Sequence, residues 1–488
     1  MMFGLFFVPL VAGLLSFIIP WDRLRRTMLM IVAGSHLAMT ACCWIVAPPT
    51  ALNGWFVLDP LGVLFLGIIS VLFFAAAIYG VQYLAKEKHH RQGRDEQFLF
   101  NNAPEAVFTG CLLIFLAAMT LVVMSQNFGV LWVAMEATTL VSAPLIYFHR
   151  HHRSLEATWK YLLICSVGIA LALLGNLFLA VTQGPEQSSL LLADLIKNGP
   201  LLNIPWLKAA FIFLFVGYGT KMGLAPMHTW LPDAHSEAPS VVSALLSGAL
   251  LNCAFVSVLR GYQACIAAGI GDFCQDIFIL FGILSLFFAT IFIFGQTDYK
   301  RMLAYSSIEH MGILSLGVGL SGAAVYGAMF HAVNHSLTKA GLFFIAGNIL
   351  SHFRTKEVKD VRGVLRVLPR SGVLWMAGFF AITGTPPFGV FLSKFMILRA
   401  ALDQGRVGLA VIFLAVLCAI FIGAARIFLP MAQGAAPEDL KNPAGKEPGF
   451  SVLPTMILLA LVLVLGLYIP GGLSDLLSAA ARMITDVP

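Results

Sequence analysis

The chain has 488 residues, of which 59% are hydrophobic and only 11% are charged, and its mean hydropathy is +0.88. Soluble proteins carry about 25% charged residues, so this composition excludes an ordinary soluble globular protein and predicts a polytopic helical membrane protein. In such a protein the net charge of +6 reflects the topology of the loops and does not indicate nucleic-acid binding.

Apolar runs long enough to cross a bilayer follow one another along the whole chain. A span needs about 20 apolar residues, and this length predicts about fourteen helices. The first run has no basic segment before it and no small-residue cleavage site, which favours a retained helix over a signal peptide. The predicted spans are residues 3–20, 27–47, 60–84, 107–124, 127–148, 158–182, 205–226, 239–260, 274–296, 301–320, 322–350, 371–400, 407–431 and 451–471.

Basic residues gather in the connections after odd-numbered spans, and the even-numbered connections are nearly bare. The positive-inside rule then places the odd connections in the cytoplasm and both termini on the outer side. The basic residues of the odd connections are Arg23, Arg25, Arg26, Lys86, Lys88, Arg91, Arg94, Arg150, Arg153, Lys160, Lys300, Arg301, Arg354, Lys356, Lys359, Arg362, Arg366, Arg370, Lys441 and Lys446. The exceptions are Lys197, Lys208, Arg260, Arg399 and Arg406.

Two predicted spans are interrupted by proline, one at Pro226 and one at Pro386 and Pro387. Each interruption has a lysine close by, Lys221 in the first and Lys394 in the second. Broken membrane helices are tolerated only where they line a cavity or are buried in protein, and in transporters they often mark inverted repeats with a site at the breaks. The predicted division is three N-terminal helices (1–106), a first antiporter-like repeat (107–260), a second repeat (261–432) and a last loop, helix and tail (433–488).

His331, His335 and Lys339 follow one another at intervals of four residues in the span 322–350. In a helix this spacing places them on one face, about 6 Å apart along the axis. Ionisable groups at membrane depth are costly and usually face a bundle interior or a wet cavity. A column with two histidines predicts a proton wire, and the alternative is a set of core polar groups that hold helices together.

Glu136 lies in the middle of the fifth span, where a carboxylate needs a partner or a proton. Lys221 is its natural partner. Burial lowers a lysine pKa and a nearby carboxylate raises it, so a lysine whose glutamate can approach or retreat is a switchable proton holder. The alternative is a static buried ion pair.

His228, Asp233, His235 and Glu237 cluster at the cytoplasmic end of the seventh span. This cluster is interpreted as an entrance for protons or as a structural loop. A metal site is disfavoured because Asp233 and His235, two residues apart, do not share a helix face.

Glu309 and His310 form a second titratable pair, in the tenth span. Lys394 has no acidic neighbour in the sequence, and it is either an exit-side proton acceptor or a lysine that snorkels to the interface. Three residues before the tenth span are expected to cap and anchor it: Asp298, Lys300 and Arg301.

The cysteines form no CxxC motif and mostly fall in apolar runs, so they are interpreted as small core residues. The sequence shows no iron–sulfur, haem or zinc signature, no Gly-rich phosphate loop and no nucleophile–base–acid set. It therefore predicts no cofactor, no metal and no active site in this chain. The cysteines are Cys42, Cys43, Cys111, Cys165, Cys253, Cys265, Cys274 and Cys418.

Three stretches carry a resemblance to a known family: FVGYGTKMGLAPMHTWLPDAHSEAPSVVSALLSG, QTDYKRMLAYSSIEHMGIL and HAVNHSLTKAGLFF. They resemble the antiporter-like, proton-conducting membrane subunits of respiratory complex I and of Mrp-type cation/proton antiporters. RSLEATWKYLLICSVGIALALLGN and the IEHMG stretch are similar to the hydrogenase-4 component F branch, from the membrane arm of formate-hydrogenlyase-type complexes.

The resemblance implies fourteen helices, two inverted five-helix repeats and a chain of Glu and Lys residues across the membrane midplane. The residues that match the family pattern are Glu136, Lys221, His331, His335, Lys339 and Lys394. The eighth helix departs from the pattern, because Ser247 and Asn252 stand where some members carry Lys or His. The link between the two halves must then run through waters or another residue. The tail after the last span is short, with no long lateral helix.

The family implies a proton-translocating subunit in a bacterial inner membrane, without a redox centre of its own. The implied partners are related antiporter-like subunits and a soluble redox arm of the nickel–iron hydrogenase type. The alternatives are a pumping subunit of complex I, a sodium/proton antiporter subunit, the membrane partner of a carbon dioxide uptake system, and an anchor for the redox arm that conducts nothing.

Overall fold

The structure is a computed structural model that describes residues 1–87, 104–184, 189–435 and 447–486. The first half of the chain forms α1 (Met2–Ile18), α2 (Asp22–Ile45), α3 (Pro60–Glu87), α4 (Glu105–Met124), α5 (Phe128–Ile146), α6 (His152–Val181), α7 (Leu192–Lys197), the 3-10 turn η2 (Gly199–Leu201), α8 (Ile204–Met222), α9 (Trp230–Glu237), α10 (Ser240–Leu245), the π-helical turn η3 (Leu246–Leu250) and α11 (Leu251–Ala267). The second half forms α12 (Gly271–Phe294), α13 (Tyr299–Gly319), α14 (Ala323–Phe353), α15 (Val364–Val367), α16 (Pro369–Thr383), α17 (Gly389–Asp403), α18 (Val407–Gln433), α19 (Gly449–Leu467) and α20 (Gly471–Thr485).

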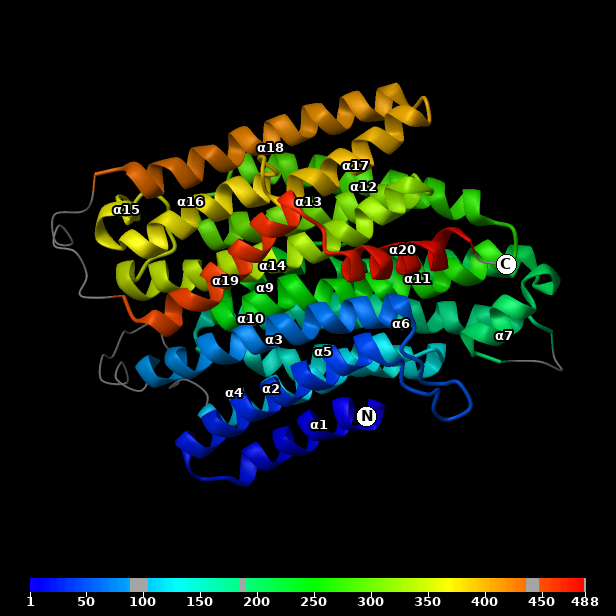
Figure 1. Ribbon diagram of the computed structural model, residues 1–488, viewed down its shortest axis with the longest axis horizontal. Helices are drawn as coiled ribbons and strands as arrows, with labels where there is room; N and C mark the ends of the chain where they lie inside the picture. The colour runs from blue at the N-terminus through cyan, green and yellow to red at the C-terminus, as the bar shows by residue number, and fades with distance from the viewer. Residues whose placement is uncertain (88–103, 185–188, 436–446, 487–488) are drawn as a thin grey trace.

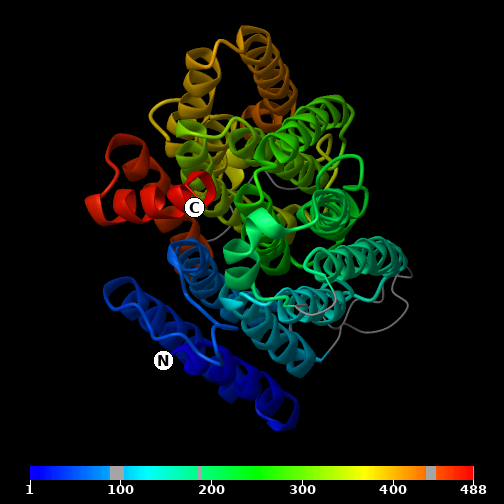
Figure 2. The same ribbon diagram turned by 90° about the vertical axis from the view of Figure 1, so that its right-hand side faces the viewer.

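The long helices pack side by side with roughly parallel axes (Figure 1). Viewed down these axes, α1 and α2 lie at one edge of the bundle and α18 lies at the opposite edge (Figure 2). Every predicted span coincides with a helix or with a divided helix, although the ends differ by several residues. Nine helices of the described residues are long and apolar enough to cross a membrane alone. The chain is an all-α polytopic membrane protein, as its sequence predicts.

Both proline interruptions are confirmed as breaks between two helices. The first half-helix, α8, ends at Gly223 with φ +81°, and α9 follows after Pro226. In the second break α16 ends at Gly384 with φ +80°, and α17 follows after Pro387. A left-handed glycine ends a helix without the steric cost that a Cβ would bring.

The order of the elements repeats along the chain. In the first half α4, α5 and α6 precede the broken pair α8 and α9, and then α10, η3 and α11. In the second half α12, α13 and α14 precede the broken pair α16 and α17, and then α18. Packing follows the same order, because α5 contacts α4 and α6 as α13 contacts α12 and α14. The predicted division into repeats agrees with this order, and its boundaries stay predictions.

Connections that were predicted to share one side meet at one end of the bundle. The connections after α1 and α14 lie at the left of Figure 1. Glu237 contacts His151 from the connection after α5 and Lys356 from the connection after α14. The side of the membrane that this end faces stays a prediction. Five of the counted basic residues lie outside the described residues: Lys88, Arg91, Arg94, Lys441 and Lys446.

Two features of the fold differ from the predicted spans. The eighth span is not a uniform helix, because η3 inserts a π-helical turn between α10 and α11. The tail after the last span forms the helix α20, which buries Leu477, Ala480 and Ile484 on one face and packs against α3, α11 and α14. The three- and four-residue spacing of these apolar residues was the available signal for an amphipathic helix.

The backbones of α6 and α8 approach each other closely at two glycines. A Cβ on Gly217 would lie 2.6 Å from the carbonyl oxygen of Gly168 and 2.6 Å from the backbone nitrogen of Ala172. These neighbours are backbone atoms, so they cannot turn aside as a flexible side chain would. Small residues of this kind let membrane helices pack in close contact.

We expect Gly217→Ala to lower the free energy of unfolding by about 1–3 kcal/mol, because the added methyl group pushes α6 and α8 apart. The measurement is the thermal unfolding midpoint of the detergent-solubilised protein. The matched control is Gly408→Ala on α18, where no atom lies within 4 Å of the added Cβ. A midpoint for Gly217→Ala equal to that of the control would contradict the close contact.

Candidate functional site

The predicted column on α14 exists, and it faces α13. The Nζ of Lys339 donates to the carbonyl oxygen of Leu303 at 2.5 Å and to the hydroxyl of Ser306, both on α13. His331 and His335 contact the same helix through the ring of His310. All three side chains of the column are fully buried. The four-residue spacing therefore directs them towards one neighbouring helix, as predicted.

A cluster of three histidines joins α13 to α14. The Nδ1 of His310 lies 2.8 Å from the Nε2 of His331, and the Nδ1 of His331 lies 2.8 Å from the hydroxyl of Ser393 on α17. The ring centroids of His310 and His335 are 4.7 Å apart. The Nε2 of His310 is buried, and among the described residues it has no hydrogen-bond partner. Buried polar atoms without protein partners are usually satisfied by hydrogen bonds to water.

Lys394 is paired with a carboxylate from another helix. Its Nζ donates to the Oε1 of Glu309 at 2.8 Å, and the two side chains are 6% and 2% exposed. The same Nζ lies 3.4 Å from the carbonyl oxygen of Thr383 at the end of α16. Lys394 does not snorkel to an interface. Its acidic partner was not apparent because Glu309 is distant in the sequence.

Lys221 is fully buried in the last turn of α8, and hydroxyl groups hold it. Its Nζ donates to the Oγ1 of Thr139 at 2.6 Å and to the hydroxyl of Tyr161 at 2.8 Å. Among the described residues no ion pair joins Lys221 to Glu136, so the two side chains stand apart in this structure. A lysine held by neutral hydroxyl groups has no compensating charge within hydrogen-bond distance.

Glu136 lies on α5 and is only half-buried. Its Oε1 accepts a long hydrogen bond of 3.5 Å from Ser166 on α6. The other oxygen, Oε2, is out of contact with solvent and has no hydrogen-bond partner. This weakly held carboxylate can change partners without the loss of strong contacts.

On the eighth span, neutral polar groups stand where some members of the family carry an ionisable residue. The hydroxyl of Ser247 in η3 lies 2.8 Å from that of Ser307 on α13. The Nδ2 of Asn252 donates to the hydroxyl of Ser336 on α14 at 2.6 Å. The Oδ1 of Asn252 is buried and has no partner. Ser247 in the π-helical turn and Asn252 in the first turn of α11 thus place two polar groups between the halves of the protein, and π-helical turns are frequent at functional sites.

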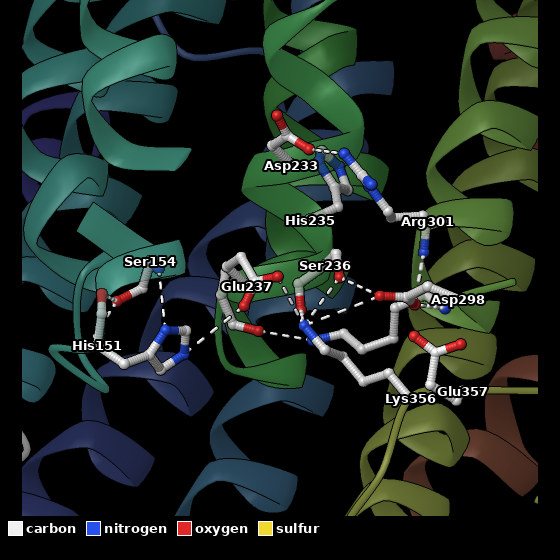
Figure 3. A network of polar contacts seen from close by, with 12 residues as sticks. His151, Ser154, Asp233, His235, Ser236, Glu237, Asp298, Arg301, Lys356 and Glu357 are labelled. Atoms are coloured by element: carbon white, nitrogen blue, oxygen red, sulfur yellow. Dashed lines mark hydrogen bonds and ion pairs between the residues drawn. The ribbon is translucent and has the colours of Figure 1, made fainter. Parts of the chain in front are cut away.

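Charged side chains tie the helix α9 to several neighbouring elements (Figure 3). Asp233 binds Lys160 of α6 at 2.9 Å and also binds Arg301 of α13. Both oxygens of its carboxylate therefore have a cationic partner. In this state Asp233 is a bridge between the two repeats.

Glu237 at the end of α9 contacts two further segments. Lys356 lies 2.7 Å from its Oε1 and the Nε2 of His151 lies 3.6 Å from its Oε2. The Nδ1 of His151 accepts from the backbone N–H of Ser154 at 3.0 Å, which places the ring proton on the Nε2 that faces Glu237. Burial lowers the pKa of His151 below its ordinary value, and the Glu237 carboxylate only partly opposes this. At neutral pH the contact is therefore between a carboxylate and a neutral ring.

His228 and His235 are buried at the first break and do not contact Asp233. His228 packs against the rings of Phe288 and Tyr305, and its Nδ1 has no partner. His235 has its Nδ1 2.9 Å from the carbonyl oxygen of Leu231, and its Nε2 has no partner. Among the described residues no three His, Cys, Asp or Glu side chains gather as metal ligands do.

The predicted cap of α13 is confirmed. The carboxylate of Asp298 accepts hydrogen bonds from the backbone N–H groups of Lys300 and Arg301, at 2.7 and 3.1 Å. The side chain of Lys300 is buried and donates to the carbonyl oxygen of Ala238 at 2.7 Å. Sequence reasoning missed the hydroxyl partners of the lysines and histidines: Thr139, Tyr161, Ser306 and Ser393. Serine and threonine are common in membrane helices, so no sequence signal separated these from the rest.

The chain is similar to known membrane subunits both in sequence and in fold. The chain matches the family described as NADH:quinone oxidoreductase/Mrp antiporter, TM, over residues 125–423. A hydrogenase-4 component F homolog of Methylacidiphilum infernorum is 33% identical over 444 residues, which cover 89% of this chain and 90% of that protein. The fold resembles a chain of the archaeal membrane-bound sulfane sulfur reductase, a respiratory membrane complex, with a TM-score of 0.87 and 20% identity over 100% of this chain and 98% of that one. It also resembles a chain of respiratory complex I from Thermus thermophilus, with a TM-score of 0.77 and 23% identity over 96% of this chain and 97% of that one. The chain therefore belongs to the NADH:quinone oxidoreductase/Mrp antiporter family of membrane subunits.

Proposed function

We propose that this protein is a proton-translocating membrane subunit of a multi-subunit redox complex. The observation that carries the proposal is the series of buried ionisable side chains at and between the two helix breaks. Lys221 stands at the first break and Lys394 at the second, with Lys339 and the histidine cluster between them. Such groups are costly at membrane depth, so a series of them indicates a path for protons.

The path needs a link between Lys221 and the α14 column. Ser247 and Asn252 are neutral and hold no mobile proton of their own, but both can hydrogen-bond to water. The Oδ1 of Asn252 and the Nε2 of His310, which have no partner among the described residues, supply polar atoms for such waters. We propose that water molecules held at η3 complete the link.

Protons enter at the first break in this proposal. His228 and His235 each have a buried ring nitrogen without a protein partner, which suits contact with water. Asp233 and Glu237 lie on α9, the half-helix that follows this break. Opening of their ion pairs would expose their carboxylates to incoming protons. Lys394 is the proton acceptor on the exit side.

The coupled electron transfer takes place in partner subunits in this proposal. The similarity to a hydrogenase-4 component F homolog supports a soluble arm of the nickel–iron hydrogenase type. The similarity to subunits of larger respiratory complexes supports neighbours of the same family in the membrane. We place the complex in a bacterial inner membrane, with the basic connections in the cytoplasm and both termini outside.

A second candidate function is an anchor for the redox arm that conducts no protons. The neutral eighth span, with Ser247 and Asn252, is the observation that favours it. The two candidates differ in one measurable property, which is proton uptake coupled to the redox reaction.

The test uses proteoliposomes that contain the intact complex, with proton uptake and the redox reaction followed together. We expect Glu136→Gln and Lys221→Ala to lose most of the coupled proton uptake while the complex assembles. The matched control for Lys221 is Lys208→Ala at the other end of α8, where the ammonium lies over the ring of Phe273 and outside the proposed path. Normal proton uptake in both assembled variants would favour the anchor.

A further inference from the structure

The second break has a charged partner that the first break lacks in this structure. Glu309 and Lys394 form an ion pair of 2.8 Å between α13 and α17, and both side chains are almost completely buried. At the first break Lys221 is bound by Thr139 and Tyr161 instead. The two lysines thus lie at similar breaks but have different partners.

The repeated order of elements makes these residues counterparts. Glu136 lies on α5, the second helix of the predicted first repeat, and Glu309 lies on α13, the second helix of the predicted second repeat. Lys221 and Lys394 lie on the two broken helices. Each repeat therefore carries a glutamate on its second helix and a lysine at its break.

The two lysines stand on opposite sides of their breaks, yet both are associated with the last turn of the first half-helix. Lys221 belongs to the last turn of α8. Lys394 follows its break, but its side chain folds back over Gly384, where an added Cβ would lie 3.0 Å from the Cδ of Lys394. Its Nζ then reaches the carbonyl oxygen of Thr383 in the last turn of α16. The carboxyl end of a helix carries a partial negative charge, which favours a cation at both places.

We propose that Glu309 is the counter-ion that Lys394 alternately binds and leaves, so that the second half has its own switchable ion pair, the counterpart of Glu136 and Lys221. The inference rests on the proposed proton-translocating function. The structure shows the second pair closed and the first pair open.

Separation of the pair supplies the proton-release step. In the closed state Lys394 is an ammonium and Glu309 is a carboxylate. When the two charges move apart in a medium of low dielectric, the neutral amine is favoured over an isolated ammonium. One N–H bond of the ammonium breaks, and its proton passes to a water molecule on the exit side. A proton that arrives from the histidine cluster then restores the ammonium.

The histidine cluster is in position to supply that proton. Ser393 precedes Lys394 on α17, and its hydroxyl lies 2.8 Å from the Nδ1 of His331. His310, which contacts His331, is the residue after Glu309 on α13. The cluster therefore touches both helices that carry the pair.

A purely structural pair makes a different prediction from a switchable one. If the pair only holds α13 to α17, single variants destabilise the complex and the neutral double variant Glu309→Gln/Lys394→Met restores both assembly and proton uptake. If the pair exchanges protons, the double variant assembles but cannot release a proton at this break. We expect its coupled proton uptake to fall by at least about tenfold at an unchanged level of assembly.

The measurement is redox-coupled proton uptake by proteoliposomes that contain the intact complex, for the double variant, Glu136→Gln and wild type. Loss of uptake in the assembled double variant supports the inference. Normal uptake in the double variant together with loss in Glu136→Gln overturns the inference and the exit-side role of Lys394, and it leaves the proton-translocating function in place. Normal uptake in both variants overturns the proposed function itself. If the double variant fails to assemble, coupled proton uptake is measured for the single variants Glu309→Gln and Lys394→Met. Normal uptake in either single variant overturns the inference.

Discussion

Replacement of Lys339 by alanine is expected to reduce redox-coupled proton translocation by about 100-fold, because a positioned proton-transfer group is lost. Lys339 is fully buried between α13 and α14, and it is the charged group of the α14 column. Its ammonium donates to the carbonyl oxygen of Leu303 and to Ser306. Alanine leaves no group at this point that can accept and release a proton.

A second variant separates the charge of Lys339 from its exchangeable proton. Arginine keeps a positive charge but is effectively never deprotonated in proteins. We therefore expect Lys339→Arg to assemble and to translocate protons as poorly as Lys339→Ala. The control is Lys359→Ala in the exposed connection after α14, which should translocate protons like wild type. Recovery of translocation in Lys339→Arg would mean that the position needs only a fixed charge.

The α14 column illustrates which parts of the site the sequence could predict. A four-residue interval is a property of a single helix, so His331, His335 and Lys339 were assigned to one face without a structure. The proline breaks are equally local, since a missing N–H and a steric clash disrupt a helix wherever proline stands. These local rules predicted the spans and the two interruptions.

Contacts between helices followed no such rule. Glu309 meets Lys394 across 85 residues of sequence, and nothing in the spacing of either helix indicates the other. The same limit explains why the hydroxyl partners of Lys221 were not predicted. Thr139 and Tyr161 approach Lys221 from α5 and α6, and only the packing of these helices selects them over Glu136. Local pattern thus identified the ionisable residues, and tertiary packing decided their partners.

Arg260 shows how packing also explains an exception in the loop charges. From the sequence, Arg260 was assigned to an even-numbered connection, where basic residues are otherwise rare. In the structure its side chain is only 1% exposed. Its Nη1 lies 2.5 Å from the Oδ2 of Asp59 and its Nη2 lies 2.8 Å from the Oδ1. Gln263 accepts from the same guanidinium at 3.2 Å and donates to the carbonyl oxygen of Met483 on α20. Arg260 is a buried, neutralised charge that joins α11 to the segment before α3, so it does not count towards topology.

We expect Asp59→Asn to lower the free energy of unfolding by about 3–5 kcal/mol, because it leaves the buried guanidinium of Arg260 without its counter-charge. The double variant Asp59→Leu/Arg260→Met should recover most of this loss, since two apolar side chains replace both charges. The matched control is Asp403→Asn, which removes one partner of the exposed pair of Arg399 and Asp403, whose side chains are 73% and 68% exposed. An exposed pair contributes about 1 kcal/mol or less, so the control should scarcely change the thermal unfolding midpoint in detergent. If Asp59→Asn lowers that midpoint no more than Asp403→Asn does, the Asp59 contact is dispensable, and the hydrogen bond to Gln263 is enough to hold Arg260 in place.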